Sequence, residues 1–105
     1  MSRFLATRNK GFRMGFDNGF EISVQWGPGN YCERKDEDFD KPQEERFWES
    51  RTAEIAIFDS KDNSMITLGK DNVDGWLTSD KVAKVITMVS LAKTKNEITE
   101  KYKTI

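Results

Sequence analysis

The sequence predicts an α+β domain in which an antiparallel sheet of four to five strands packs on one C-terminal helix. Apolar and polar residues alternate in two regions, 12–26 and 52–68, each with a turn near its middle, which is typical of β-hairpins. Apolar residues recur at helical spacing at about 79–93. A length of 105 residues suits one core, so we expect a single domain over 1–105.

The first hairpin has two candidate registers. A two-residue turn at Asn18-Gly19 would set Phe16 opposite Glu21 and divide the apolar residues between the two faces of the sheet. A three-residue loop that starts at Asp17, with a left-handed Gly19 in a β-bulge, keeps the apolar residues on one face. The sequence therefore predicts the bulged register. Its cross-strand pairs are Phe16 with Phe20, Met14 with Ile22, and Phe12 with Val24.

Further strands are expected on both sides of this hairpin. Residues 3–7 predict a short strand, and Thr52–Phe58 carries apolar residues on both faces, which indicates a central strand. A four-residue loop at 60–63 then closes a second hairpin to Met65–Leu68, and 69–75 is expected to be a polar connection. The predicted pairs of the second hairpin are Ile57 with Ile66, Ile55 with Leu68, and Phe58 with Met65.

The helix has clear start signals. Thr78 or Ser79 suits the N-cap, Asp80 lies in the first turn, and Leu77 is placed to pack on Val82. The face predicted to cover the sheet consists of Val82, Val85, Ile86 and Val89.

Two alternatives exist beyond Lys93. If the helix continues to Tyr102, then Leu91, Ile98 and Tyr102 form a second apolar face that suits a homo-oligomer through the C-terminal helix. Alternatively, Asn96 breaks the helix and begins a short second helix or a frayed tail.

Composition excludes several function classes. A net charge of −1 argues against a partner that is a nucleic-acid polymer. The single cysteine, Cys32, excludes an internal disulfide and indicates a cytoplasmic location, and no apolar run is long enough to span a membrane. Histidine is absent. Catalytic residues, metal ligands and cofactors are therefore not predicted.

The segment 33–46 is expected to be a long, exposed and mobile loop. It holds seven carboxylates and four basic groups and has almost no apolar residues. Carboxylates alternate from Asp36 to Asp40 as in a calcium loop, but Lys41 stands where that pattern needs glycine and Phe47 where it needs glutamate. We therefore interpret the segment as a solvated acidic loop.

A glycine-rich turn flanked by aromatic residues is the main candidate site. Glycines allow a ligand to approach the backbone, N–H groups in a tight turn can hold an anion, and nearby aromatic rings can stack on a base. The alternative interpretation is an ordinary type II turn whose aromatic neighbours belong to the core. The predicted ligand-binding residues are Trp26, Gly27, Gly29, Asn30, Tyr31, Arg34, Trp48 and Arg51.

Three stretches resemble small uncharacterised accessory proteins of tailed bacteriophages: FEISVQWGPGNYC at 20–32, WESRTAEIA at 48–56, and GWLT at 75–78. The resemblance implies a phage accessory or anti-defence protein in the host cytoplasm. We therefore expect a non-enzymatic binding protein, oligomeric, that sequesters a nucleotide-like anionic ligand. The alternatives are a protein-interaction module that inhibits a host protein, and a small hydrolase that uses carboxylates such as Glu49 or Glu54.

Overall fold

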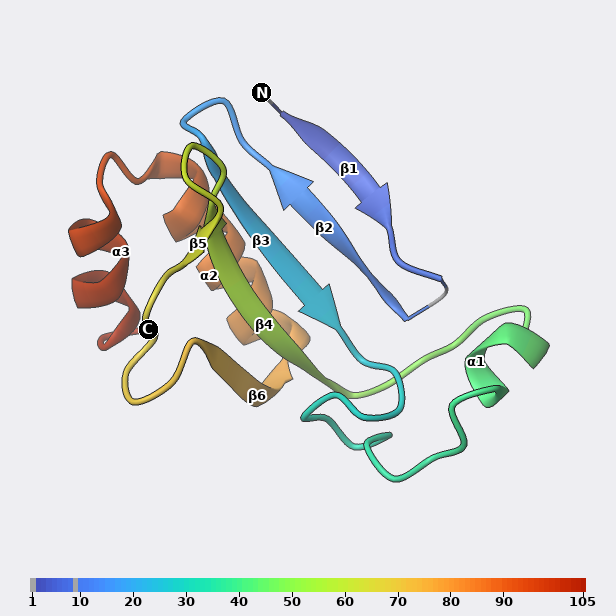
Figure 1. Cartoon of the computed structure of the whole chain (residues 1–105). Coiled ribbons are helices and arrows are strands. Elements are labelled where there is room, and N and C mark those ends of the chain that lie inside the picture. Colours follow the sequence, from blue (N-terminus) through green and yellow to red (C-terminus); the bar gives the residue numbers. More distant parts are fainter. Residues whose placement is uncertain (1, 9) are drawn as a thin grey trace.

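A computed structural model describes residues 2–8 and 10–105 and shows an antiparallel sheet with one helix packed on one face and a second helix beside it (Figure 1). Over the described residues the sheet has six strands in the order β1-β2-β3-β4-β5, with β6 also paired to β4. The predicted α+β class is confirmed. The strands are β1 (Arg3–Ala6), β2 (Gly11–Gly15), β3 (Phe20–Gln25), β4 (Thr52–Asp59), β5 (Ser64–Met65) and β6 (Val73–Thr78), and the helices are α1 (Lys41–Glu44), α2 (Ser79–Leu91) and α3 (Lys95–Tyr102).

The β2–β3 hairpin adopts the bulged register. Phe12 lies opposite Val24 and Met14 opposite Ile22. The loop closes through hydrogen bonds that Phe16 N–H donates to Phe20 O (2.9 Å) and Gly19 N–H donates to Phe16 O (3.0 Å). Gly19 has φ +91°, the left-handed conformation that the three-residue loop requires.

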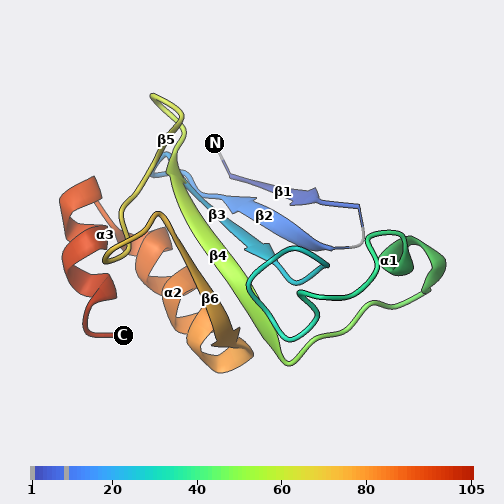
Figure 2. The same ribbon diagram turned by 60° about the horizontal axis from the view of Figure 1, so that its bottom comes forward.

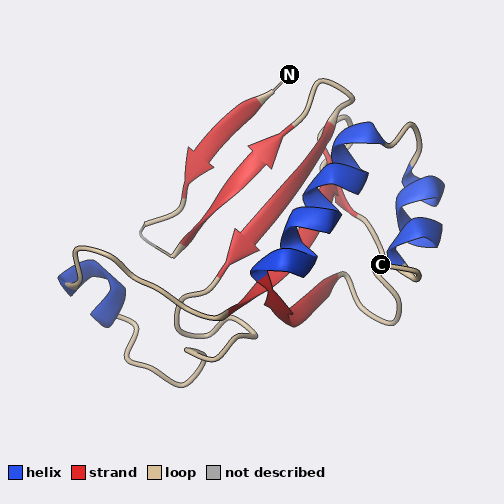
Figure 3. Ribbon diagram, turned by 180° about the vertical axis from the view of Figure 1, so that it is seen from behind, coloured by secondary structure: helices blue, strands red, loops and turns tan. Residues whose placement is uncertain are grey.

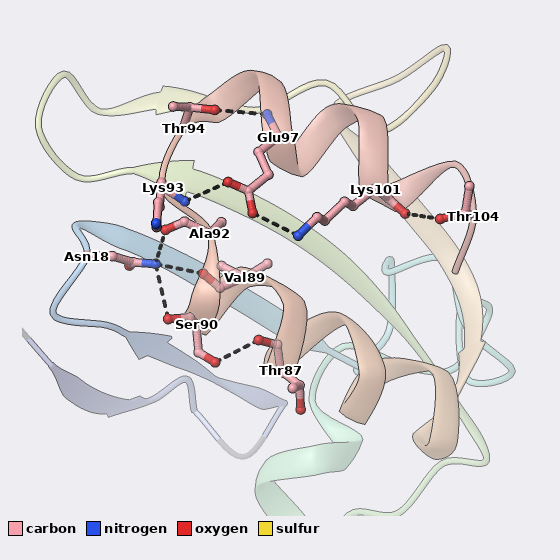
Figure 4. Close-up of polar contacts among 10 residues, drawn as sticks. All are labelled: Asn18, Thr87, Val89, Ser90, Ala92, Lys93, Thr94, Glu97, Lys101 and Thr104. Carbon is pink, nitrogen blue, oxygen red and sulfur yellow. Dashed lines mark hydrogen bonds and ion pairs between the residues drawn. The ribbon is translucent and has the colours of Figure 1, made fainter.

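The tip of this hairpin also caps α2. Asn18 Nδ2 donates to Val89 O at 2.8 Å, Ala92 O at 2.9 Å and Ser90 O at 3.3 Å (Figure 4). The last carbonyls of a helix have no partner within the helix, so the asparagine amide satisfies groups that would otherwise need water. The turn that sets the strand register therefore also holds the C-terminal end of α2.

The second hairpin is only partly as predicted. Ile66 N–H donates to Ile57 O at 2.8 Å and Phe58 lies opposite Met65, as expected. However, β5 ends at Met65, and Ile55 pairs with Asp74 of β6 instead of with Leu68. The predicted pairing of Ile55 with Leu68 is therefore wrong.

Strand β6 occupies residues that were expected to be a polar connection and the start of the helix. Its register on β4 shifts between Ala53 and Ile55, and Trp76 takes a left-handed φ of +53° there. An irregular strand that contains Asp74 and Gly75 lacks the alternation and composition that predict strands, which explains why the sequence pattern missed it.

Helix α2 crosses one face of the sheet and packs on β3, β4 and β6 (Figure 3). It begins after Thr78, whose hydroxyl accepts from Lys81 N–H at 3.3 Å, and it ends at Leu91 rather than at 93. Ile86 is only half-buried, whereas the other members of the predicted face are buried. The fully buried aliphatic side chains of the core are Ile22, Ile55, Ile57, Val85, Val89 and Ile98.

The C-terminal segment forms a separate helix, α3. The break lies before Thr94, whose hydroxyl accepts from Glu97 N–H at 3.1 Å as the N-cap, and not at Asn96. Ile98 and Tyr102 are buried in the core of the domain, whereas Leu91 is 71% exposed. These residues therefore do not form the continuous apolar face on which the predicted oligomer through this helix rested.

The connection 26–51 forms turns and the short α1 beyond the ends of β3 and β4 (Figure 2). The segment 33–46 is mostly exposed, as expected, but it is not a loop throughout, because it contains α1. Pro42 is buried, Lys35 carbonyl accepts from Gly29 N–H (2.9 Å), and Glu33 N–H donates to the Thr52 hydroxyl (2.9 Å). These contacts link the connection to the sheet.

Candidate ligand-binding cleft

An apolar cleft of about 470 Å³ lies between α2 and the neighbouring ends of the sheet strands. Its volume falls within the range typical of small-molecule sites, roughly 300–1,000 Å³. The sheet and the loop before β4 supply Phe12, Val24, Trp26, Trp48, Ala53 and Leu77, helix α2 supplies Val82, Ala83 and Ile86, and polar groups come from Glu49, Ser50, Arg51, Thr52 and Ser79.

Two tryptophans form one wall. Trp26 Nε1 donates to Trp48 O at 2.7 Å, and Trp48 Nε1 donates to Trp26 O at 3.2 Å. Phe12 packs edge-on against Trp26 with 6.2 Å between ring centres. Because each indole N–H is satisfied by the other residue's backbone, both rings are held in place in the wall of the cleft.

Arg34 lies behind this wall. Its guanidinium carbon stands 3.7 Å from the centre of the Trp48 ring, and the group donates to Glu49 O (2.8 Å) and to Glu37 Oε1 (3.5 Å). Arg34 does not line the cleft. We interpret it as a residue that positions Trp48 through cation–π stacking.

Arg51 is the one basic residue among the described cleft-lining residues. Its backbone N–H donates to Glu33 at 2.7 Å, but its guanidinium makes no hydrogen bond or ion pair within the described part of the chain. Glu49 and the hydroxyls of Ser50, Thr52 and Ser79 lie around the same cleft. A ligand in the cleft would therefore contact an apolar interior. It would also contact several polar side chains, among them the cation of Arg51, which is unpaired among the described residues.

The glycine turn is an ordinary type II turn, but its aromatic neighbours are not buried in the core, because Trp26 is half-buried and Tyr31 is exposed. Asn30 N–H donates to Gly27 O at 3.2 Å, and Gly29 has φ +84°, which matches a type II turn. The turn does not line the cleft. Asn30 Nδ2 and Tyr31 N–H both donate to Glu54, at 3.2 and 3.1 Å, so these donors are already engaged.

Tyr31 instead stacks on Trp76, with ring centres 5.6 Å apart and planes inclined by 15°. Both rings are exposed, by 44% and 56%. The predicted site residues therefore divide into two places. Trp26, Trp48 and Arg51 line the cleft, whereas Gly27, Gly29, Asn30, Tyr31 and Arg34 lie outside it.

The sequence pattern did not single out the helical wall of the cleft. Ala83 and Ile86 lie at spacings that equally suit a core face, and no polar or glycine signal marks them. They border the cleft because α2 packs on β3, β4 and β6 and not closely on β2, and this arrangement is a property of the tertiary structure.

In the described part of the chain, features outside the cleft give little support for a catalytic or metal-binding role. Cys32 is buried, and burial raises the pKa of its thiol, which disfavours the nucleophilic thiolate. Within residues 2–8 and 10–105, no group of three potential metal ligands is found. In the same described ranges, no helix combines the length and apolar character needed to cross a bilayer.

Comparison with protein-family models, curated proteins and solved structures finds no significant match for this chain. Its function is therefore inferred from the cleft and from the surface of the domain.

Proposed function

We propose that this protein is a non-enzymatic binding protein whose cleft holds a small planar ligand with an anionic group, the class to which nucleotides belong. The supporting observation is that the two fixed tryptophans line the same cleft as Arg51, whose guanidinium has no partner within the described residues. Indole rings stack on planar groups, and arginine binds carboxylate and phosphate through charge-assisted hydrogen bonds.

The wall is organised before a ligand arrives. Trp48 is buried, bonded to Trp26, and stacked against Arg34 on one side. Since the ring needs little further ordering, less conformational entropy is lost on binding, which favours affinity.

The lining suits binding better than catalysis. Glu49 is the only carboxylate among the described residues that line the cleft, and the sequence has no histidine. An acid–base pair is therefore not supplied by these side chains. Together with the resemblance to phage accessory proteins, this supports sequestration of a ligand in the cytoplasm of a host cell as the proposed role.

Calorimetry with a panel of cyclic and linear nucleotides, with aromatic carboxylates as a second panel, tests the proposal. We expect one panel to bind, and Arg51→Glu to weaken binding by roughly 10- to 100-fold, the equivalent of one charged hydrogen bond. Arg46→Glu makes the same charge change outside the cleft and should have little effect.

A cleft-filling variant separates the cleft from the rest of the surface. Ala83→Trp should abolish binding because Ala83 lines the cleft, whereas Lys84→Trp, its neighbour on α2 outside the cleft, should not. Failure of both panels, or binding that survives Ala83→Trp, would contradict the proposal.

A second candidate is the protein-interaction module that inhibits a host protein. The observation that favours it is the exposed Tyr31–Trp76 stack, because exposed tryptophan and tyrosine dominate many protein interfaces. We expect Trp76→Ala to abolish capture of a specific host protein while Ala83→Trp does not. Capture that is insensitive to Trp76→Ala would argue against this candidate.

A further inference from the structure

The outer edge of β1 is unpaired. In the described chain β1 forms a ladder with β2 alone. Thr7 N–H donates to Gly11 O at 3.1 Å in the same register. Because hydrogen-bonded positions alternate along an antiparallel pair, the odd-numbered residues of β1 bond to β2. The backbone N–H and C=O groups of Phe4 and Ala6 therefore point away from the sheet.

This edge strand is short, but it lacks the other features that usually prevent strand addition. Phe4 is 81% exposed and Leu5 is 41% exposed, and β1 contains no proline, lysine or bulge. Its one charged residue, Arg3, lies 2.8 Å from the buried carboxylate of Glu21. An exposed edge of this kind is a template for another strand.

An uncovered apolar surface accompanies the edge. Phe4 lies opposite Met14 and Ala6 opposite Phe12, so these side chains share the face of the sheet on which α2 packs. Helix α2 covers β3, β4 and β6, and it leaves this part of the face half-buried or exposed.

We propose that a second copy of this chain pairs with β1 in antiparallel orientation, with Leu5 on the twofold axis. Phe4 of each copy then exchanges both main-chain hydrogen bonds with Ala6 of the other. The two-fold axis makes the interface isologous, so each unpaired group on one edge meets its complement on the other.

Charge complementarity favours a second copy over an unrelated strand. In this register Arg3 faces Thr7, so like charges do not oppose each other. Arg8 of one copy comes near Ser2 of the other, whose N–H donates to Asp17 at 3.1 Å. Arg8 and Asp17 are exposed and make no ion pair within the described residues, so the dimer would form this pair twice.

The dimer also extends the surface beside the cleft. Phe4 of the second copy would lie across from Ala6, which neighbours the cleft residue Phe12. The pairing itself does not depend on a ligand. Because β1 is short, we expect a weak dimer, with a dissociation constant on the order of micromolar.

Ala6→Pro tests the edge directly. Proline removes the N–H that points outward and spares the hydrogen bonds to β2, and edge strands tolerate it there. Sedimentation over a range of concentrations should show dimerisation of the wild type and of Ala6→Thr, which keeps the N–H, but a monomer for Ala6→Pro. A wild type that stays monomeric, or an Ala6→Pro variant that dimerises normally, would overturn the proposal.

A cross-link tests the register without relying on proline. Leu5→Cys would place two thiols across the axis at a cross-strand Cβ separation of roughly 4.5–5.5 Å, near the range a disulfide needs. The native Cys32 is buried, and Met65→Cys on β5 serves as an exposed control. We expect oxidation to convert Leu5→Cys to a covalent dimer well ahead of Met65→Cys, and equal rates would count against the register.

A charge exchange tests the partner. Arg8→Glu and Asp17→Arg should each weaken the dimer several-fold, and the double variant should recover most of the affinity. Weakening that simply adds in the double variant would show that these residues do not meet.

Discussion

Trp26 and Trp48 each donate an indole N–H to the backbone carbonyl of the other, at 2.7 and 3.2 Å. The pair joins the end of β3 to the segment just before β4, so it links the two ends of the connection 26–51. It therefore closes the ends of the connection that carries α1, and it builds the aromatic wall of the cleft.

Trp48→Phe tests this pair. The variant keeps an aromatic ring but loses the N–H that donates to Trp26, and phenylalanine offers Arg34 a weaker cation–π partner. We expect a loss of about 1 kcal/mol in the free energy of unfolding, measured by urea denaturation. Trp76→Phe, at an exposed ring, should cost clearly less. Equal losses would mean that the reciprocal bonds contribute little.

Asn18→Asp isolates the cap that the hairpin provides for α2. Aspartate is nearly isosteric and keeps the oxygen that accepts from Phe20 N–H at 3.0 Å, but it cannot donate to Val89 or Ala92. Its negative charge would also lie at the negative end of the helix dipole. We expect a loss of about 1–3 kcal/mol in unfolding free energy, at least as large as for Asn18→Ala. A smaller loss for the aspartate variant would contradict the cap.

Because of Tyr102, we expect the free energy of unfolding to depend on pH in the alkaline range. Burial, together with the hydrogen bond that its hydroxyl donates to Asp74, raises the pKa of Tyr102 well above its usual value. The fold therefore favours the neutral phenol. The contribution of the neutral phenol to the free energy of unfolding is fully present below the pKa of about 10 that tyrosine has in the unfolded chain. It is lost as the pH rises through the higher pKa of the folded state. Unfolding free energies measured from pH 8 to 11 should fall less steeply for Tyr102→Phe than for the wild type, and parallel curves would refute this.

Truncation of Ile86 can be compared with truncation of Ile98 to test whether Ile86 borders open space. Both are helical isoleucines, but Ile98 is fully buried whereas Ile86 is half-buried and lines the cleft. Ile98→Ala should cost about 2–5 kcal/mol in unfolding free energy. Ile86→Ala should cost less than that range, because much of its side chain faces open space. Similar costs in denaturation would show that Ile86 belongs to the core.

Sequence patterns predicted the elements that are determined by interactions among residues close together in the chain. The bulged register follows because only that alignment keeps Phe12, Met14 and Phe16 on the same face as their partners. An N-cap at Thr78 or Ser79 follows from side-chain chemistry that a single turn contains, and the structure uses Thr78. For the candidate site, the sequence pointed to Trp26, Trp48 and Arg51, but it did not distinguish them from the glycine turn beside them.

Long-range packing decided what the local patterns missed. Strand β6 exists because β4 supplies a neighbour that accommodates the bulge at Trp76, although the composition of β6 is poor for a strand. Likewise, α3 folds back so that Ile98 and Tyr102 enter the core, whereas spacing alone left open a continuous helix with a face for a partner or a break and a short second helix.

The α+β class, the first hairpin with its bulge and the start of α2 follow from the amino-acid sequence, because alternation, turn chemistry and capping act over a few residues. The cleft and the free edge of β1 depend instead on packing among elements far apart in the chain. The cleft exists where α2 stops covering the sheet, and the edge is free because the strand order places β1 outermost with β2 as its one neighbour in the described chain.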